Sequence, residues 1–169
     1  MLRPSVFLSY ALVLLGLCSG CGYHFGPGNS EPSTIVIGMF ANQTHEPLLE
    51  KDLTDLVISE VARGPVYTPV ESLRDSLLSL EGVVNSYVSS AVAYDANDTI
   101  VRYLVEVSAT VTLREEPSGK VLWKGKASAA QEYSADSDKA LQRQLEEQAR
   151  DVALARLAEE ISQRLAQRF

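Results

Sequence analysis

Hydrophobic and polar residues alternate along residues 101–114 more regularly than anywhere else in the chain. The odd-numbered positions from Val101 to Leu113 are apolar, and the even-numbered positions are mostly polar, with Leu104 as the exception. A period of two is typical of a strand with one buried face. Residues 115–119 (Glu-Glu-Pro-Ser-Gly) are rich in turn formers, so we expect a hairpin that leads into a partner strand over residues 120–133.

Two further strands and two helices are predicted by the rest of the pattern. Residues 34–40 are rich in β-branched side chains and bounded by turn formers, and residues 83–94 return to β-branched and aromatic side chains. Apolar residues recur at helical spacing from Leu49 to Val61, until Gly64 ends the helix. A second helix follows the cap-forming residues 134–137 and continues to the end of the chain. Residues 65–82 show no clear pattern apart from an extended stretch over 66–70.

The apolar positions of the C-terminal helix step by four residues, from Leu141 to Leu165. Because an α-helix has 3.6 residues per turn, this stripe drifts by about 40° per step, so the helix has to wrap around its sheet or bend. The order strand, helix, three strands, helix predicts the α+β class. We expect two helices packed on one face of a mixed or antiparallel sheet of about four strands, in a single domain over residues 34–169.

The first 33 residues predict export and a lipid anchor. Arg3, the apolar residues 6–17 and the small pair Ser19-Gly20 are typical of a signal peptide over residues 1–20. The ending Cys18-Ser-Gly-Cys21 resembles the lipobox of bacterial lipoproteins, although its first residue is Cys where Leu is usual. Cys21 is therefore the expected acylation site, at the start of a short flexible tether over residues 21–33. The alternative is a redox or zinc Cys-x-x-Cys pair, which cleavage after Gly20 would destroy.

Composition and missing motifs exclude several classes of function. The 169 residues are 46% hydrophobic and 22% charged, which fits one globular domain, and no later stretch reaches the roughly 18 apolar residues of a membrane-spanning helix. The two histidines, His24 and His45, are too few for a multi-histidine metal site, and no phosphate loop or Gly-x-Ser-x-Gly occurs. Two matches to the glycosylation sequon, at Asn42 and Asn97, are better explained as turn formers. We expect no enzyme, no metal, no cofactor and no nucleic-acid partner.

Three segments resemble the family of lipopolysaccharide-assembly lipoproteins, LptE. They are Cys21-Gly-Tyr-His-Phe25 after the signal peptide, Phe40-Ala-Asn-Gln-Thr44 before the Leu-rich helix, and the long strand that contains Val107-Ser-Ala-Thr-Val111. The resemblance implies a lipid-anchored protein on the periplasmic side of the outer membrane. It implies a plug that helps to assemble a β-barrel of the LptD type and assists the insertion of lipopolysaccharide into the outer leaflet, without catalytic residues.

A second resemblance keeps another function open. The Phe-x-Asn-x-Thr segment at residues 40–44 also resembles outer-membrane lipoproteins that activate a periplasmic cell-wall synthase. Such an activator needs a long linker to cross the wall, whereas residues 22–33 span at most about 40 Å. This activator is the alternative to the barrel plug.

A polar sheet face and a few basic residues are the candidate binding surface. We expect the even-numbered side chains of residues 101–113 to lie on the face away from the helices, together with Lys120, Lys124 and Lys126, and to point into a barrel lumen or into solvent. Without Arg3 the chain has 14 basic and 22 acidic residues and a net charge of −8, so only a local cluster could attract an anionic glycolipid. The candidate cluster is Arg114, Lys120, Lys124 and Lys126, at one end of the predicted hairpin. The resemblance adds Arg102 and Lys139, the basic residues nearest to the two regions that the family associates with lipopolysaccharide: the turn before the long strand and the segment just before the last helix.

Overall fold

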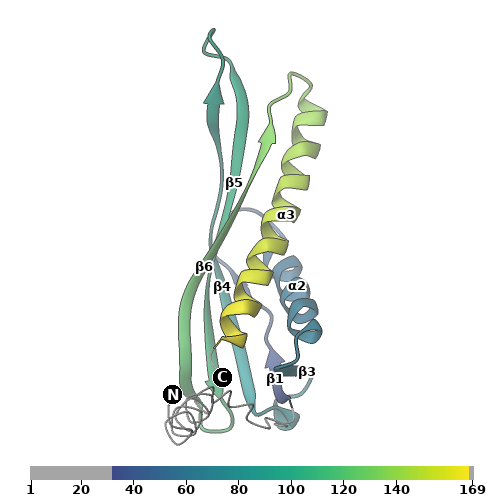
Figure 1. Cartoon of the computed structure of the whole chain (residues 1–169), viewed down its shortest axis with the longest axis vertical. Coiled ribbons are helices and arrows are strands. Elements are labelled where there is room, and N and C mark those ends of the chain that lie inside the picture. Colours follow the sequence, from purple (N-terminus) through teal and green to yellow (C-terminus); the bar gives the residue numbers. More distant parts are fainter. Residues whose placement is uncertain (1–31, 168–169) are drawn as a thin grey trace, which may run out of the picture. The chain divides into compact units, whose positions relative to one another are not determined.

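Three long antiparallel strands form the centre of the sheet (Figure 1). They are β4 (Leu78–Tyr94), β5 (Ile100–Glu115) and β6 (Lys120–Ser134), and each pairs with the next along the chain. The computed structural model describes residues 32–167. The predicted signal peptide, the acylation site Cys21 and nearly all of the tether lie outside the described residues.

Three short strands extend the sheet on the far side of β4. Strand β1 (Ser33–Ile37) pairs in parallel with both β4 and β3 (Tyr67–Val70), and β2 (Ala41–Asn42) pairs in parallel with β4 beyond the end of β1. The strand order is therefore β3-β1-β4-β5-β6, with β2 beside β4. The sheet is mixed because its first half is parallel and its second half antiparallel.

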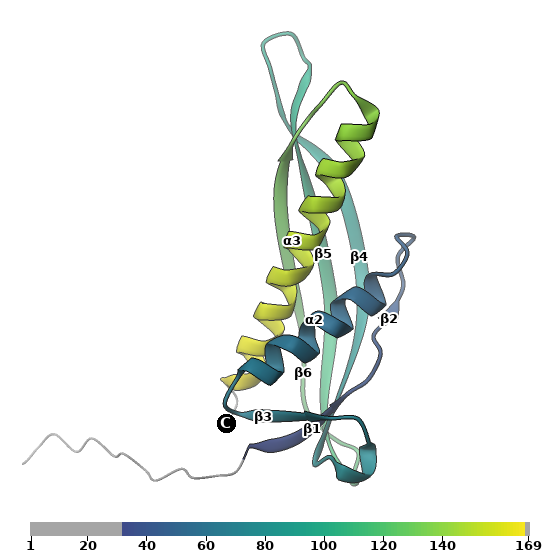
Figure 2. The ribbon, with the colours of Figure 1, turned by 90° about the vertical axis from the view of Figure 1, so that its right-hand side faces the viewer.

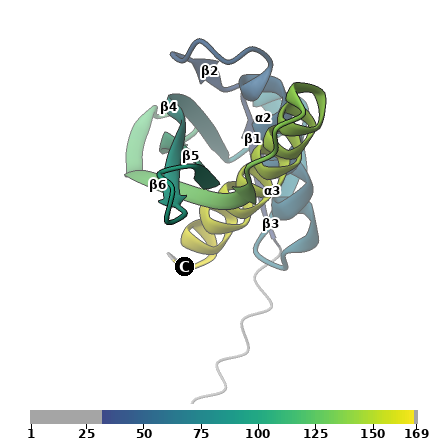
Figure 3. The ribbon, with the colours of Figure 1, turned by 90° about the horizontal axis from the view of Figure 1, so that it is seen from above.

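Both helices, α2 (Leu49–Arg63) and α3 (Lys139–Ala166), cover the same face of the sheet (Figure 3). The odd-numbered side chains of β5 point towards them, and Val105, Val107, Ala109, Val111 and Leu113 are all buried. From the helices, this core receives Leu49, Leu53, Val57 and Val61 of α2, and Ala149, Ala153, Leu154, Leu157, Ala158, Ile161 and Leu165 of α3. The core lies between the sheet and the two helices.

The predicted α+β class, with two helices on one face, is confirmed, and all four predicted strands are present. The sheet has six strands rather than about four because the two-residue β2 follows a break after β1, and the extended stretch over 66–70 is the edge strand β3. The drift of the apolar stripe along the last helix is also visible. Leu141 is exposed and Leu145 is half-buried, whereas the buried positions of α3 begin at Ala149.

Arginines of α3 cover the outer edge of β6. The guanidinium of Arg156 donates to the carbonyl oxygen of Ala130 at 2.9 Å, and that of Arg164 donates to the carbonyl oxygen of Lys126 at 2.7 Å. Unpaired backbone groups on an edge strand can pair with another chain, so these contacts protect β6 as well as fixing α3.

Phe40 lies in the break between β1 and β2, in close contact with Gly82 of β4. The Phe40 ring lies against the backbone of Gly82, and the Phe40 amide donates to Thr54 Oγ1 on α2 at 3.0 Å rather than to a strand. A Cβ at residue 82 would be 2.4 Å from Phe40 Cε2, which is far below van der Waals contact. Only glycine fits at this position of β4.

We therefore predict that Gly82→Ala lowers the free energy of unfolding by about 1–3 kcal/mol, as expected for an overpacked core. Chemical denaturation of the purified protein measures this change. The control is Gly38→Ala, because a Cβ there would be 3.6 Å from the nearest atom, the carbonyl oxygen of Leu80. In a Phe40→Leu background the penalty for Gly82→Ala should shrink, and an equal penalty in both backgrounds would contradict the proposed cause.

Candidate functional site

One face of the sheet carries no helix among residues 32–167, and we call it the uncovered face. The register of the long strands places residues of three strands in rows across it: Glu81, Thr112 and Lys124 form one row, and Val88, Glu106 and Ala130 form another. Polar side chains predominate on this face, as the alternation along β5 predicts. The remaining members are Ser79, Val83, Ser86, Ser90 and Ala93 of β4, Arg102, Leu104, Ser108, Thr110 and Arg114 of β5, and Val121, Lys126, Ser128, Glu132 and Ser134 of β6.

Three serines cross the middle of the uncovered face. Ser86, Ser108 and Ser128 lie opposite one another on the three strands. Ser108 is 2% exposed, and its hydroxyl has no hydrogen-bond partner among residues 32–167. Ser86 is half-buried and Ser128 is exposed, so of the three hydroxyl groups only those of Ser86 and Ser128 can donate to or accept from a partner at this surface.

Three of the predicted basic residues lie together on one half of the uncovered face. Lys124 and Lys126 point to the same side of β6 because they are two residues apart, at a spacing of about 7 Å. Neither lysine has an ion-pair partner within the part of the chain that the structure describes. Arg114 lies on the neighbouring strand and pairs with Glu81, with 3.3 Å between Nε and Oε2.

The expectation that Lys120 shares a face with Lys124 and Lys126 is wrong. Trp123 lies opposite Leu113 in the regular register, on the helix side, but the pairing of β5 with β6 then shifts by one residue, so that Val121 lies opposite Arg114. Lys120 then lies opposite Glu115, on the other parity. A register shift of one residue moves every following side chain to the opposite face, which no regular alternation can predict.

The two other candidate residues lie at the opposite end of the long strands. Arg102 forms an ion pair with Glu132, with 2.9 Å between Nη1 and Oε2, and both side chains are more than half exposed. Lys139 is the first residue of α3. Because Arg102 and Arg114 are twelve positions apart on β5, about 40 Å separates them. The six predicted residues therefore do not form one cluster.

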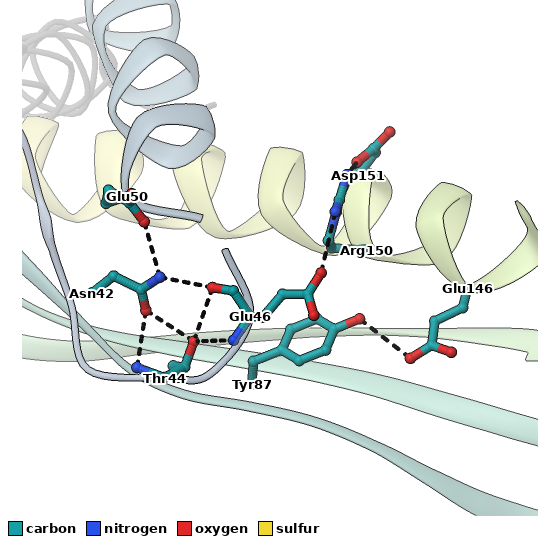
Figure 4. A network of polar contacts seen from close by, with 8 residues as sticks. All are labelled: Asn42, Thr44, Glu46, Glu50, Tyr87, Glu146, Arg150 and Asp151. Carbon is teal, nitrogen blue, oxygen red and sulfur yellow. Dashed lines mark hydrogen bonds and ion pairs between the residues drawn. The ribbon is translucent and has the colours of Figure 1, made fainter. Parts of the chain in front are cut away.

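The loop between β2 and α2 contains a polar network that the sequence did not indicate (Figure 4). The Asn42 side chain donates to the carbonyl oxygen of Glu46 at 2.7 Å and to Glu50 Oε2 at 2.9 Å, and its Oδ1 accepts from the amide and hydroxyl of Thr44. These contacts fix the turn before α2. They explain why Asn and Thr stand two residues apart, which confirms that Asn42 is a turn former.

The same loop reaches α3 and β4. Arg150 of α3 binds Glu46, with 3.3 Å between Nη1 and Oε1, and also binds Asp151 at 3.0 Å. The hydroxyl of Tyr87 on β4 donates to Glu146 of α3 at 3.5 Å, and burial raises the pKa of Tyr87. An open cleft of about 220 Å³ is lined here by Glu46, Tyr87, Arg143, Glu146, Glu147 and Arg150. We call it the α3 cleft.

The α3 cleft can bind charged groups of either sign. Its lining combines two arginines with three glutamates and contains no cysteine, serine or histidine. His45 lines a second cleft of about 350 Å³ on the other side of Tyr87, together with Gln43, Thr44, Glu46, Asn85 and Ser86. Within residues 32–167, no group of three or more His, Cys, Asp or Glu side chains could hold a metal ion. No helix in this part of the chain is long and apolar enough to cross a membrane.

Solved structures with the same fold come from several bacteria. The chain is similar to the rare lipoprotein B from Shewanella oneidensis, with 18% identity, a TM-score of 0.58 and coverage of 80% of this chain and 95% of that one. It is also similar to a hypothetical protein from Chlamydia trachomatis, with 9% identity, a TM-score of 0.56 and coverage of 79% and 95%. A protein from Xanthomonas campestris has 12% identity, a TM-score of 0.56 and coverage of 85% and 94%. At these identities the likeness shows the fold alone.

The family is established by the sequence itself. No curated protein matches the chain. Residues 33–169, however, match the family described as LptE, lipopolysaccharide-assembly, and this match includes every strand and helix described above. The chain therefore belongs to the LptE family of lipopolysaccharide-assembly proteins.

Proposed function

We propose that this protein is an outer-membrane lipoprotein that plugs and supports an LptD-type β-barrel and assists the insertion of lipopolysaccharide into the outer leaflet. Acylated Cys21 anchors it from the periplasmic side, and the uncovered face docks against the wall of the barrel lumen. Membership of the LptE family supports the role in lipopolysaccharide assembly in general. A plug acts by binding and needs no catalytic group.

The length and polarity of the uncovered face carry this proposal. Strands β4, β5 and β6 have 17, 16 and 15 residues, whereas most strands have about 5–6. At about 3.3 Å per residue each spans roughly 50 Å, which exceeds the 40–45 Å of a bilayer with its headgroups. The lumen of a barrel is polar, so serine, threonine and charged side chains can find hydrogen-bond partners along the whole depth of the membrane.

Two unpaired lysines make one half of the uncovered face suitable for a phosphate group. Lys124 and Lys126 lie beside Arg114 and have no carboxylate partner among residues 32–167. The net negative charge of the chain repels anions at long range, but contacts within a few ångströms are much less affected by distant charges. Lipopolysaccharide contact is therefore expected at these residues.

The first prediction concerns the partner. When this chain is purified by a tag from outer membranes in mild detergent, an LptD-type barrel protein should co-purify with it in equal amounts, as measured by quantitative mass spectrometry. Recovery of a periplasmic cell-wall synthase without a barrel would replace the plug by the alternative function, the synthase activator. A chain recovered alone would contradict both functions.

The second prediction concerns lipopolysaccharide. Replacing Lys124 and Lys126 by Ser should weaken lipopolysaccharide binding roughly tenfold, since loss of one charge-assisted hydrogen bond costs about 1.5 kcal/mol. The barrel complex should form at wild-type levels. The matched control removes the same charge from α2, on the other side of the sheet, by Lys51→Ser and Arg63→Ser. If both double variants bind lipopolysaccharide equally well, the lysines have no specific role.

The third prediction concerns the anchor. Cys21→Ser should abolish acylation and release the protein from the outer membrane, because a thiol is required to attach the lipid. The mass of the mature N-terminal peptide reports acylation directly. Cys18→Leu is the control, and it should leave acylation unchanged, since residue 18 would be removed with the signal peptide. If Cys18→Leu abolished function as strongly as Cys21→Ser, the Cys-x-x-Cys alternative would be favoured.

A further inference from the structure

The second half of β4 has a neighbouring strand on one side only. Strands β1 and β2 pair with β4 at Leu78–Leu80 and at Val83–Val84, and β5 pairs with its other side along its whole length. From Asn85 to Tyr94, no strand within residues 32–167 lies on the side opposite β5. We call residues 85–94 the open edge, and it is visible beyond β2 in Figure 2.

Regular strand geometry shows which backbone groups the open edge presents. The helix-facing residues Leu80 and Val84 direct their carbonyl oxygens to the outer side, where they accept from the amides of Gly38 and Gln43 at 2.9 and 3.0 Å. Side-chain face and hydrogen-bonding direction alternate together along a strand. After the bulge at Asn85, the helix-facing positions are Tyr87, Ser89 and Ala91. Their amides and carbonyls therefore point outward, and none bonds elsewhere within the described chain.

The open edge lacks the features that usually protect an exposed strand. Residues 82–94 contain no charged residue and no proline. Natural edge strands carry lysine, proline or a cover to prevent pairing with other chains. Strand β6, at the other edge of the long sheet, has such a cover, because Arg156 and Arg164 bind its carbonyl oxygens. One molecule thus protects one long edge and leaves the other available.

The α3 cleft lies next to the open edge and supplies charged groups for an added strand. Tyr87 is both a member of the open edge and a lining residue of the cleft. Arg143 and Glu147 also line the cleft, and neither has an ion-pair partner in the described part of the chain. An extended segment paired with β4 would place side chains of one parity close to these two groups.

We propose that the open edge of β4 binds an extended segment of the barrel partner by strand addition. The segment pairs its backbone with Tyr87, Ser89 and Ala91, and it carries side chains that match Arg143 and Glu147. This inference rests on the proposed function, because it names where the barrel partner binds beyond the uncovered face.

A second copy of the chain fits the open edge less well. Irregular pairing follows Ala91, so the regular part of the edge comprises residues 86–91 and presents three outward-facing residues. Two such edges pair over too small a surface to reach the roughly 1,200 Å² that a stable interface buries. A barrel partner that also contacts the uncovered face supplies the missing area.

Hydrogen exchange in the complex tests strand addition directly. The full chain is compared alone and in complex with its barrel partner, with exchange resolved to single amides. The amides of Tyr87, Ser89 and Ala91 should exchange at least tenfold more slowly in the complex. The amides of Val88 and Ser90 point towards β5 and should change less, so they serve as internal references.

Two variants at residue 89 separate the contribution of the backbone amide to binding from that of the side chain. Ser89→Pro removes the outward amide without removing a bond to β5, and it should reduce the yield of the barrel complex several-fold. Ser89→Ala keeps the amide and loses only the hydroxyl contact with Tyr133 at 2.9 Å, so it should behave as wild type. A thermal unfolding curve of Ser89→Pro establishes that the variant is folded, and the wild-type exchange measurement does not depend on it.

The outcomes distinguish this inference from the proposed function. If the wild-type chain forms no complex with a barrel, the proposed function and the binding of a barrel segment at the open edge are both wrong. If wild type forms the complex but the three amides exchange as in the free chain, strand addition alone is wrong. If the same amides exchange slowly in the free chain, and this protection disappears on dilution, then a second copy of the chain binds the open edge instead.

Discussion

The alternation of side chains along β5 is the constraint on which the rest of the structure depends. Its odd-numbered residues, from Val105 to Leu113, are buried against the helices, and this burial fixes the face on which α2 and α3 pack. The even-numbered residues are then left on the uncovered face, which carries no helix in the described part of the chain. A single sequence pattern thus provides both the stability of the core and the polar surface that is available for a partner.

Small irregularities decide which residues meet on that surface. The shift next to Leu113 places Val121 opposite Arg114 and separates Lys120 from Lys124 and Lys126. The bulge at Asn85 adds one residue to β4. The helix-facing positions are therefore even-numbered up to Val84 and odd-numbered from Tyr87 to Ala91. Without these two irregularities, Lys120 would share a face with Lys124 and Lys126, and other residues of β4 would present the outward amides.

The sequence predicted the class of fold and the long strands because those elements have strong periods. The sequence did not predict the two-residue strand β2, which follows the contact between Phe40 and Gly82, two residues far apart in the chain. It also did not predict the hydrogen bonds of Asn42 with Thr44 and Glu46, because these lie in an irregular segment.

The sequence also placed Arg114, Lys120, Lys124 and Lys126 at one hairpin end, apart from Arg102 and Lys139. It could not show that Lys120 lies on the other face, because that depends on a register shift that alternation alone cannot give.

Helix α3 makes different contacts with the two long edges of the sheet. On β6 its arginines replace a neighbouring strand, since Arg156 and Arg164 occupy carbonyl oxygens that would otherwise be free. On β4 the helix contributes Arg150 and Glu146, which bind Glu46 and Tyr87 near the start of the open edge. The outward backbone groups beyond them have no backbone partner within residues 32–167. The same helix therefore prevents pairing at one edge and forms one wall of a charged cleft at the other. Because the edge at β6 is covered and the open edge is not, we expect an added strand to pair with β4, and this pairing requires no change in the fold of the chain.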